Sequence, residues 1–475
     1  FFKQKTAYEI STRDWSSDVC SSDLLETFGN CLRIPELRSR LIFTGLVLVV
    51  ARLISLTPIP GLDGSALNAH FERSSGQGGV VSFYSLFTGG ALEKCAVGSL
   101  GIFPYISATI VIQLLSAVLP GLAKLAREEG GRAKIIAYGR YLTVLLCLGQ
   151  GLVMAIGWEN PREAFNYDGS VVLIENRFIY LAQTVTILTT GTLLLMWLGE
   201  QVSERGIGNG VSLIITINIL ARLPLAVTSL WTGFFPPDGA AAKFRWPHAV
   251  LLLILLAVVV AGVILVTQAQ RKIPVQHAQR AVGRKVFAGQ TSFLPLKVNY
   301  AGVMPVIFAQ ALLMFPGVIF DKLGSSAQIA FFSELGRLMK PDSIFYLVAE
   351  SLMIIFFSYF WVATQFNELQ ISDDLKKSGG YIPGIRPGAA TSEFLHKAMS
   401  RLTLAGAVFL AVLASIPALM NMFLKIDFNV ATFFGGTSLL ITVGVLLDTL
   451  RQMEGHLLMR QYDGFLKKGR VKGRM

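Results

Sequence analysis

Few ionisable side chains lie within the long apolar segments of this chain, and these residues are the first candidates for chemistry inside a membrane. Charged groups are costly in hydrocarbon and are usually functional where they occur. Arg52 and Asp448 lie near the ends of their segments, where they can snorkel to the interface. Glu350 lies deeper, and we expect it either near the outer interface or paired with a neighbour. A pump or a proton-coupled carrier would require more such groups.

The chain also lacks the sequence patterns of common catalytic and metal sites. It contains no G-x-x-x-x-G-K-[ST] phosphate loop, no H-E-x-x-H pair and no G-x-S-x-G nucleophile turn. The four cysteines form no C-x-x-C pair; they are Cys20, Cys31, Cys95 and Cys147. We therefore expect no enzymatic activity, no metal and no cofactor.

Ten long apolar segments organise the sequence. A membrane-spanning helix needs roughly 20 mostly apolar residues, and backbone polar groups in hydrocarbon must be paired, which leaves helices or closed barrels. These segments are too long and too continuously apolar for barrel strands. The composition agrees, with 53% hydrophobic and 15% charged residues. We predict spans at 41–56, 102–119, 136–157, 178–199, 209–229, 247–268, 301–321, 344–366, 399–420 and 434–450.

The loops between the spans alternate between many and few Lys and Arg residues. By the positive-inside rule, the basic loops face the cytosol, which places both termini there. Residues 1–24 lack the membrane character of the rest and resemble translated adapter tails, so we take them as non-native and draw no function from them. Residues 25–40 are typical of an amphipathic helix at the cytosolic interface. The basic tail, residues 451–475, is expected in the cytosol.

A moderately apolar stretch at residues 83–99 precedes the second span and is interrupted by Gly89 and Gly90. It is too interrupted to cross the bilayer. Pro104 then opens the first turn of the next span, where proline is tolerated. The stretch is either a re-entrant half-helix, which requires protein or a water-filled cavity around it, or a loop lying on the membrane surface.

Several segments, in the right order, resemble the SecY family, the large subunit of the bacterial Sec translocon. They are GGALEKCAVGSLGIFPYISATIVIQLL, GEQVSERGIGNGVSLII, LPLKVNYAGVMPVIFA, LKKSGGYIPGIRPG and FGGTSLLITVGVLLD. The resemblance covers essentially all of residues 25–475. It implies an all-α polytopic membrane protein whose ten transmembrane helices form two pseudosymmetric inverted halves, at 41–229 and 247–450, with a re-entrant plug helix at 83–99.

The resemblance also implies a ring of branched apolar side chains at the narrowest point of a channel. The corresponding residues are Ile102, Ile106, Ile215, Ile307 and Ile441. Ile102 and Ile106 are spaced i, i+4, as are Val211 and Ile215, so each pair shares one helical face. A narrow apolar ring blocks ions by dewetting. Without the resemblance, any one of these isoleucines would be read as a core or lipid-facing residue.

The plug and a lateral gate follow from the same resemblance. The plug residues are Phe83, Leu86, Phe87, Gly89, Gly90 and Leu92. The gate lies between the second and seventh spans, and its polar candidates are Ser107, Thr109, Gln113 and Asn299. Single Ser or Thr residues in spans often bond only to their own backbone, which leaves their gate role open.

Two long basic loops, residues 268–300 and 367–400, carry the expected contacts with cytosolic partners. Positive-inside charge explains their sign but not their length. The resemblance implies docking of the SecA motor and of the ribosome at Arg271, Lys272, Arg280, Arg284, Lys285, Lys376, Lys377 and Arg386. Arg386 is the residue that we expect to be critical for SecA.

The family implies a protein-conducting channel in the bacterial plasma (inner) membrane. It would pass unfolded secretory proteins across the membrane and release transmembrane segments laterally into lipid. The implied partners are SecE, SecG, SecA, the ribosome, signal sequences, nascent chains and membrane lipid. A secondary transporter of a small solute, built on inverted repeats, is the alternative. The scarcity of charges within the spans and of a polar midplane site argues against it.

Overall fold

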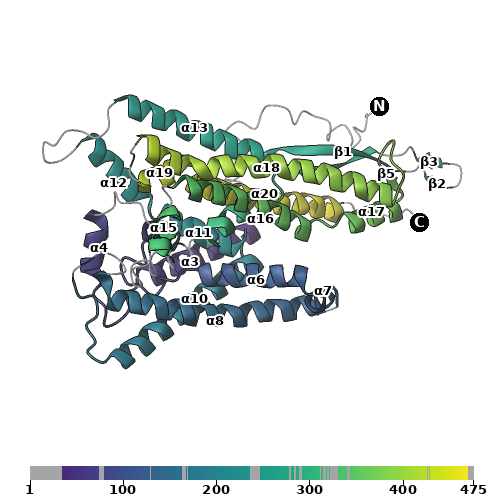
Figure 1. Cartoon of the computed structure of the whole chain (residues 1–475). Coiled ribbons are helices and arrows are strands. Elements are labelled where there is room, and N and C mark those ends of the chain that lie inside the picture. Colours follow the sequence, from purple (N-terminus) through teal and green to yellow (C-terminus); the bar gives the residue numbers. More distant parts are fainter. Residues whose placement is uncertain are drawn as a thin grey trace.

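The computed structural model of the chain is mostly helical, and its long helices form an elongated bundle (Figure 1). It describes residues 35–468, except 74–79, 129, 163–166, 168, 236–245, 278–279, 283–284, 288–290, 311, 314–316, 318–319, 321–329, 340–342, 425 and 427. Among the described residues, eight helices are long and apolar enough to cross a membrane, and Phe103–Ser116 forms a shorter apolar helix. The count of ten spans stays a prediction.

The first half of the chain forms helices at all five predicted spans. The long helices are α3 (Pro35–Leu56), α6 (Phe103–Val118), α8 (Gly131–Glu159), α10 (Arg177–Arg205), α11 (Gly210–Leu220) and α12 (Leu223–Phe234). The short ones are α4 (Gly64–Arg73), α5 (Val80–Thr88) and α7 (Pro120–Arg127). Pro104 lies in the first turn of α6, as predicted, where its missing N–H is not needed. The fifth span is divided, because α11 ends before Arg222, which is the N-cap residue of α12.

The described residues of the second half also form helices. They are α13 (Trp246–Gln268), α15 (Ala330–Leu338), α16 (Ile344–Gln365), α17 (Glu368–Lys377), α18 (Ala389–Leu424), α19 (Phe428–Gly435) and α20 (Thr437–Lys468). The structure describes the seventh predicted span in part, with helix at 304–310. Helices α18 and α20 extend well beyond the predicted spans, because polar and basic residues continue the helix outside the apolar stretch.

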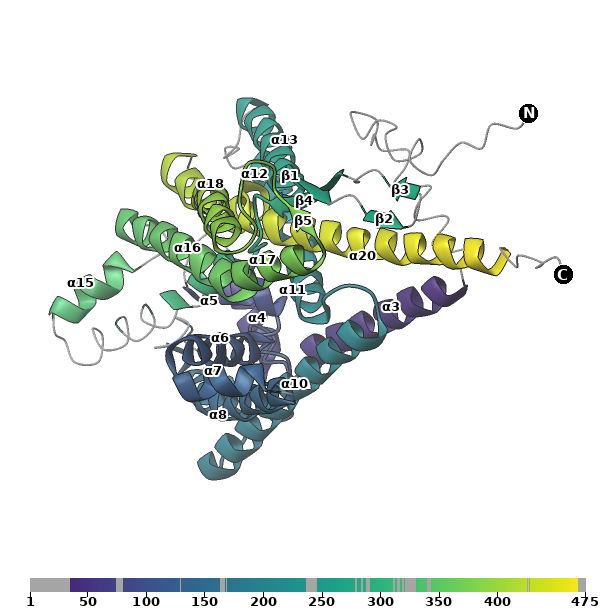
Figure 2. The same cartoon turned by 90° about the vertical axis from the view of Figure 1, so that its right-hand side faces the viewer.

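The two halves of the chain lie side by side as two groups of helices (Figures 1 and 2). Helices α3, α6, α8 and α10 form one group, and α13, α16, α18 and α20 form the other (Figure 1). Helix α11 lies between them and contacts α3, α10 and α20. The main hydrophobic cluster of the molecule draws residues from both groups, so one core joins the halves.

Five strands, which the sequence analysis did not predict, lie at one end of the bundle (Figure 1). Strand β1 (Gln270–His277) pairs antiparallel with β4 (Thr291–Lys297) on one side and with β5 (Gly380–Tyr381) on the other. Strands β2 (Arg280–Val282) and β3 (Lys285–Phe287) form a separate hairpin. The loop that follows α13 and the loop that follows α17 are therefore joined in one sheet.

Gly210, at the start of α11, lets this helix approach α10 closely. A Cβ atom at this position would lie 2.0 Å from the carbonyl oxygen of Gly199. We therefore expect Gly210→Ala to lower the free energy of unfolding by about 1–3 kcal/mol, as overpacking usually does. Thermal unfolding in detergent micelles measures this change.

Gly149→Ala is the matched control, because a Cβ atom at Gly149, in the middle of α8, would have no neighbour within 4 Å. Equal unfolding midpoints for the two variants would contradict the role of the α10–α11 contact.

Candidate functional site

The five isoleucines predicted for the ring come from both halves of the chain and are buried in one hydrophobic cluster. Each exposes 4% of its surface or less. Ile102 and Ile106 come from the start of α6, Ile215 from α11, Ile307 from the helical residues 304–310 and Ile441 from α20. Val211 is partly buried against the same cluster. The structure thus brings the five residues into one core, and their role as a pore constriction stays a prediction.

The re-entrant stretch packs on the helix that carries two of these isoleucines. In α5, the ring of Tyr84 stacks on that of Phe103 at 5.6 Å, and the ring of Phe87 meets Phe103 edge-on at 5.2 Å. The Tyr84 hydroxyl donates to the Leu100 carbonyl oxygen at 3.0 Å. Leu86, Phe87 and Leu92 are buried. The stretch therefore lies inside the protein, which agrees with a re-entrant element and not with a surface loop.

Backbone hydrogen bonds tie the non-helical part of this stretch to the carboxyl end of α3. The N–H of Val97 donates to Thr57 at 2.9 Å, and the N–H of Gly98 donates to Ile54 at 3.2 Å. In return, the N–H of Ile59 donates to the Cys95 carbonyl oxygen at 2.9 Å. These bonds pair peptide groups that would otherwise be unsatisfied at membrane depth.

Gly89 and Gly90 turn the chain after α5 with left-handed φ angles of +66° and +83°. A Cβ atom at Gly89 would lie 2.4 Å from Nη1 of Arg52 and 3.1 Å from the backbone of Asn218. The two glycines thus satisfy a backbone requirement as well as a steric one. The glycine pair marks this turn in the sequence, but the local pattern does not indicate Arg52 and Asn218 as its neighbours.

Two arginines hold this turn, and the sequence analysis missed their role. Arg52 does not snorkel to the interface as expected, because its guanidinium is turned inward and donates to the Gly89 carbonyl oxygen at 2.9 Å. Arg222 donates to Ser85 and forms an ion pair with Glu93. The Ser85 hydroxyl also donates to Glu93 at 2.7 Å. Glu93 and Arg222 lie 129 positions apart, and only their opposite charges could have suggested this pair.

The polar candidates for the lateral gate bond locally. Thr109 donates to the Tyr105 carbonyl oxygen at 2.8 Å, and Asn299 donates to the Gly302 carbonyl oxygen at 3.0 Å. Ser107 and Gln113 are half-buried on α6. The structure thus places three of the four on one helix, and their gate role stays a prediction.

A polar contact between two spans occurs between the seventh predicted span and α16. Gln310 donates to the Glu350 carboxylate at 2.9 Å, and both side chains are buried. Of the two expectations for Glu350, pairing with a neighbour is confirmed. Gln310 was not predicted as the partner, although an amide side chain within an apolar span is a signal that could have indicated it.

A cavity of about 830 Å³ lies between the halves, next to the ring. Its lining includes Ile106 and Val211, and it continues to Lys297 of β4, toward the sheet end of the bundle. Arg140 of α8 and Glu200 of α10 form an ion pair at 2.8 Å in its wall. The cavity lining thus combines charged residues, such as Arg140, Glu200 and Lys297, with apolar residues that include Ile106 and Val211.

The predicted docking residues lie at the sheet end. Arg271 and Lys272 are exposed on β1, Lys376 and Lys377 are exposed at the end of α17, and Arg386 is exposed in the following loop. Arg280 lies in β2 and Lys285 in β3, whereas Arg284 falls outside the described residues. A second hydrophobic cluster seats the sheet on α16 and α18 through Ile273, Leu296, Phe366 and Leu395. The basic side chains of the two loops thus share one support.

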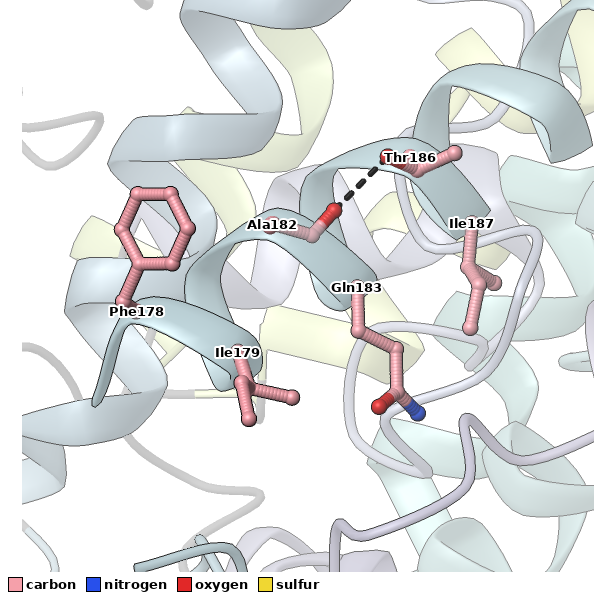
Figure 3. A pocket seen from close by; sticks show the side chains of 6 residues that line it. All are labelled: Phe178, Ile179, Ala182, Gln183, Thr186 and Ile187. Atoms are coloured by element: carbon pink, nitrogen blue, oxygen red, sulfur yellow. Dashed lines mark hydrogen bonds between the residues drawn. The ribbon is translucent and has the colours of Figure 1, made fainter. Parts of the chain in front are cut away.

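A second hollow lies on α10, and it has the character of a lipid-facing surface (Figure 3). All six of its lining residues come from this one helix, and none is charged; they are Phe178, Ile179, Ala182, Gln183, Thr186 and Ile187. Gln183 donates to the Pro60 carbonyl oxygen at 3.0 Å, and Thr186 donates to Ala182 at 2.7 Å. Both polar side chains thus form hydrogen bonds within the protein, so the lining of this hollow does not indicate a catalytic or polar ligand-binding site.

The Gln310–Glu350 contact predicts a specific stability pattern. Gln310→Leu leaves the buried Glu350 without its donor, and we expect the free energy of unfolding to fall by about 1–3 kcal/mol. Gln310→Leu combined with Glu350→Leu should recover most of this loss, because replacing both partners by apolar groups is nearly neutral. Denaturant unfolding of the two single variants and the double variant measures the coupling. If the loss in the double variant equals the sum of the losses in the single variants, Gln310 and Glu350 do not stabilise each other, which would contradict this prediction.

Comparison with known proteins agrees with this architecture. The SecY family model matches residues 96–450. The protein translocase subunit SecY of Chlamydia trachomatis is 41% identical over 95% of this chain and 100% of that protein. The protein of the same name from Escherichia coli strain K12 is 39% identical, over 93% of this chain and 96% of its own length. A solved protein-conducting channel covers 91% of this chain and 94% of its own with a TM-score of 0.58, at 20% sequence identity. With its re-entrant segment packed against a core that joins two groups of helices, the chain belongs to the SecY family.

Proposed function

We propose that this chain is the protein-conducting channel subunit of a bacterial Sec translocon. It passes unfolded secretory proteins across the membrane and releases transmembrane segments sideways into lipid. The observation that carries this proposal is the meeting of five isoleucines from both halves in one buried cluster, with the re-entrant segment packed on it. The names of its relatives in the SecY family support the same function.

The mechanism needs no covalent step. A polypeptide enters the cavity next to Ile106 and Val211 and pushes between the isoleucines. Branched apolar side chains can yield to a chain, but they offer ions no replacement for their hydration shell. The re-entrant segment at residues 83–99 closes the far side of the ring and moves aside during passage.

The sheet end of the bundle faces the cytosol in this proposal, with both termini on the same side. Its exposed basic residues, among them Arg271, Lys376 and Arg386, bind the SecA motor or the phosphates of ribosomal RNA. SecE and SecG complete the membrane complex. The energy for transport comes from ATP hydrolysis by SecA, from chain elongation at the ribosome or from the proton-motive force.

The lateral gate opens between α6 and the seventh span. Thr109 and Asn299 bond within their own segments, so helix packing contributes more to the closed gate than these polar groups do. Interhelical hydrogen bonds in membranes average about 0.6 kcal/mol. An apolar signal-sequence helix can therefore replace one helix–helix contact by another at low cost.

The alternative, a transporter of a small solute, is not favoured. Glu350, the candidate for solute or ion binding within a span, already accepts a hydrogen bond from Gln310. The relatives that cover most of the chain are translocase subunits.

Reconstitution tests the channel and its docking loop together. The chain from residue 25 onward, with SecE and SecG in liposomes, should protect a radiolabelled preprotein from protease when SecA and ATP are present. Arg386→Glu should reduce the protected fraction severalfold, because it reverses an exposed charge at the docking end.

Arg337→Glu is the control, since Arg337 is exposed on α15, in the segment between the seventh span and α16, and not in the docking loops. No protected product with SecA bound would remove the channel proposal. Equal protection with Arg386→Glu and the parent would keep the channel and remove the assignment of Arg386.

The ring makes a separate prediction about ions. Ile215→Ala widens the apolar constriction, and we expect the resting ion conductance of the reconstituted complex to rise severalfold. Planar-bilayer recording measures this change.

Ile354→Ala is the matched control, because Ile354 is fully buried in the same cluster but lies on α16, outside the ring. Equal conductance increases in the two variants would attribute the leak to lost packing and contradict the ring.

A further inference from the structure

Two arginines from different helices meet at the turn of the re-entrant segment. Arg52 belongs to α3, and Arg222 is the N-cap residue of α12. Arg52 donates to the Gly89 carbonyl oxygen, and Arg222 bonds to Ser85 and Glu93, on either side of Gly89 in the sequence. The side chains of Arg222 and Glu93 expose only 14% and 9% of their surface. This group is a largely buried charge cluster beside the Gly89–Gly90 turn.

The cluster has more positive than negative charge. Within the part of the chain that the structure describes, Glu93 is the carboxylate that pairs with Arg222, and Arg52 makes no ion pair. Nη1 of Arg52 and Nε of Arg222 are buried and have no hydrogen-bond partner among the described groups. If Glu93 leaves with the plug, two guanidinium groups lose their counter-charge together. A buried charge that loses its partner is strongly destabilising.

The backbone of the segment wraps around these two side chains. A Cβ atom at Gly89 would lie 2.4 Å from Nη1 of Arg52, and one at Gly90 would lie 3.4 Å from Cζ of Arg222. The arginines belong to spanning helices, whereas Glu93 belongs to the segment that moves. Opening of the channel therefore separates the charges instead of carrying them along together.

We propose that Arg52 and Arg222 form a carboxylate-binding site that holds Glu93 in the closed channel and takes up acidic side chains of the passing polypeptide once the plug has left. The proposal rests on the proposed function, because it assumes a channel with a movable plug. Guanidinium groups bind carboxylates through charge-assisted hydrogen bonds. The site would make exit easier for acidic segments and harder for basic ones.

Cys95 gives a readout of the closed state that needs no transport. Its thiol is buried, two residues after Glu93. A parent variant retains Cys95 alone, with Cys20→Ser, Cys31→Ser and Cys147→Ala, in the complex with SecE and SecG. The rate of its reaction with N-ethylmaleimide is followed by mass spectrometry. We expect Glu93→Gln and Arg222→Gln to react about tenfold faster or more, because each leaves a buried charge unpaired.

Two controls separate the charge from packing and from folding. Arg222→Lys retains the positive charge and should react nearly as slowly as the parent. Arg177→Gln removes an exposed cation from an ion pair with the half-buried Glu159 at the start of α10, away from the cluster, and should leave the rate unchanged. Equal rates for Glu93→Gln and the parent, or a rate for Arg222→Lys as fast as for Arg222→Gln, would overturn the proposal.

Transport then tests the open state. Preproteins with a run of Glu or a run of Lys at the same position are translocated with SecA and ATP, and an ionophore removes the membrane potential. The parent should translocate the preprotein with the Glu run faster than the preprotein with the Lys run. The ratio of these two rates should fall toward one in the variant that combines Arg52→Gln with Arg222→Gln. An unchanged ratio would overturn the proposal. If the parent translocates neither preprotein, the proposed function fails, while the Cys95 rates still report on the closed state.

Discussion

Peptide groups that leave helical geometry at membrane depth must find partners in protein, and the segment between α5 and α6 depends on this constraint. Its backbone exchanges hydrogen bonds with the end of α3 through Val97, Gly98 and Cys95. Tyr84 and Arg52 satisfy two further carbonyl oxygens. Because these partners come from a spanning helix and from the segment itself, the segment can be buried without a strand or a long helix of its own. The aromatic contacts with Phe103 then fix its position against the ring.

The core of the molecule serves two purposes that usually conflict. It joins two groups of helices, and in the proposed function it must also part along a path through its centre. The isoleucines of α6, α11 and α20 expose only 1–4% of their surface, so apolar contact stabilises the closed state. Dispersion and apolar contacts are not directional, which lets the same side chains pack against a passing chain.

Local patterns explain which parts of this structure could be predicted. Most of the apolar spans, the proline at the start of α6 and the interrupted stretch at residues 83–99 are visible in short windows of sequence, and the described residues contain them, with the seventh span described in part. The pairing of β1 with β5 was not predicted, because Gln276 and Tyr381 lie far apart in the sequence. The Glu93–Arg222 pair was missed for the same reason, since its partners are far apart in the sequence. Arg52 was misplaced because hydropathy gives the depth of a residue but not the direction of its side chain.

The three-stranded sheet links two loops that a sequence treats as independent. Strand β5 pairs with the end of β1, Tyr381 with Gln276 and Gly380 with His277. Apolar residues of β1 and β4 pack on α16 and α18. A load applied to either loop is therefore shared by the helices that hold both. Mechanically, the sheet couples the two loops to each other and to α16 and α18, so we expect a partner that pulls on one loop to apply force to both helices.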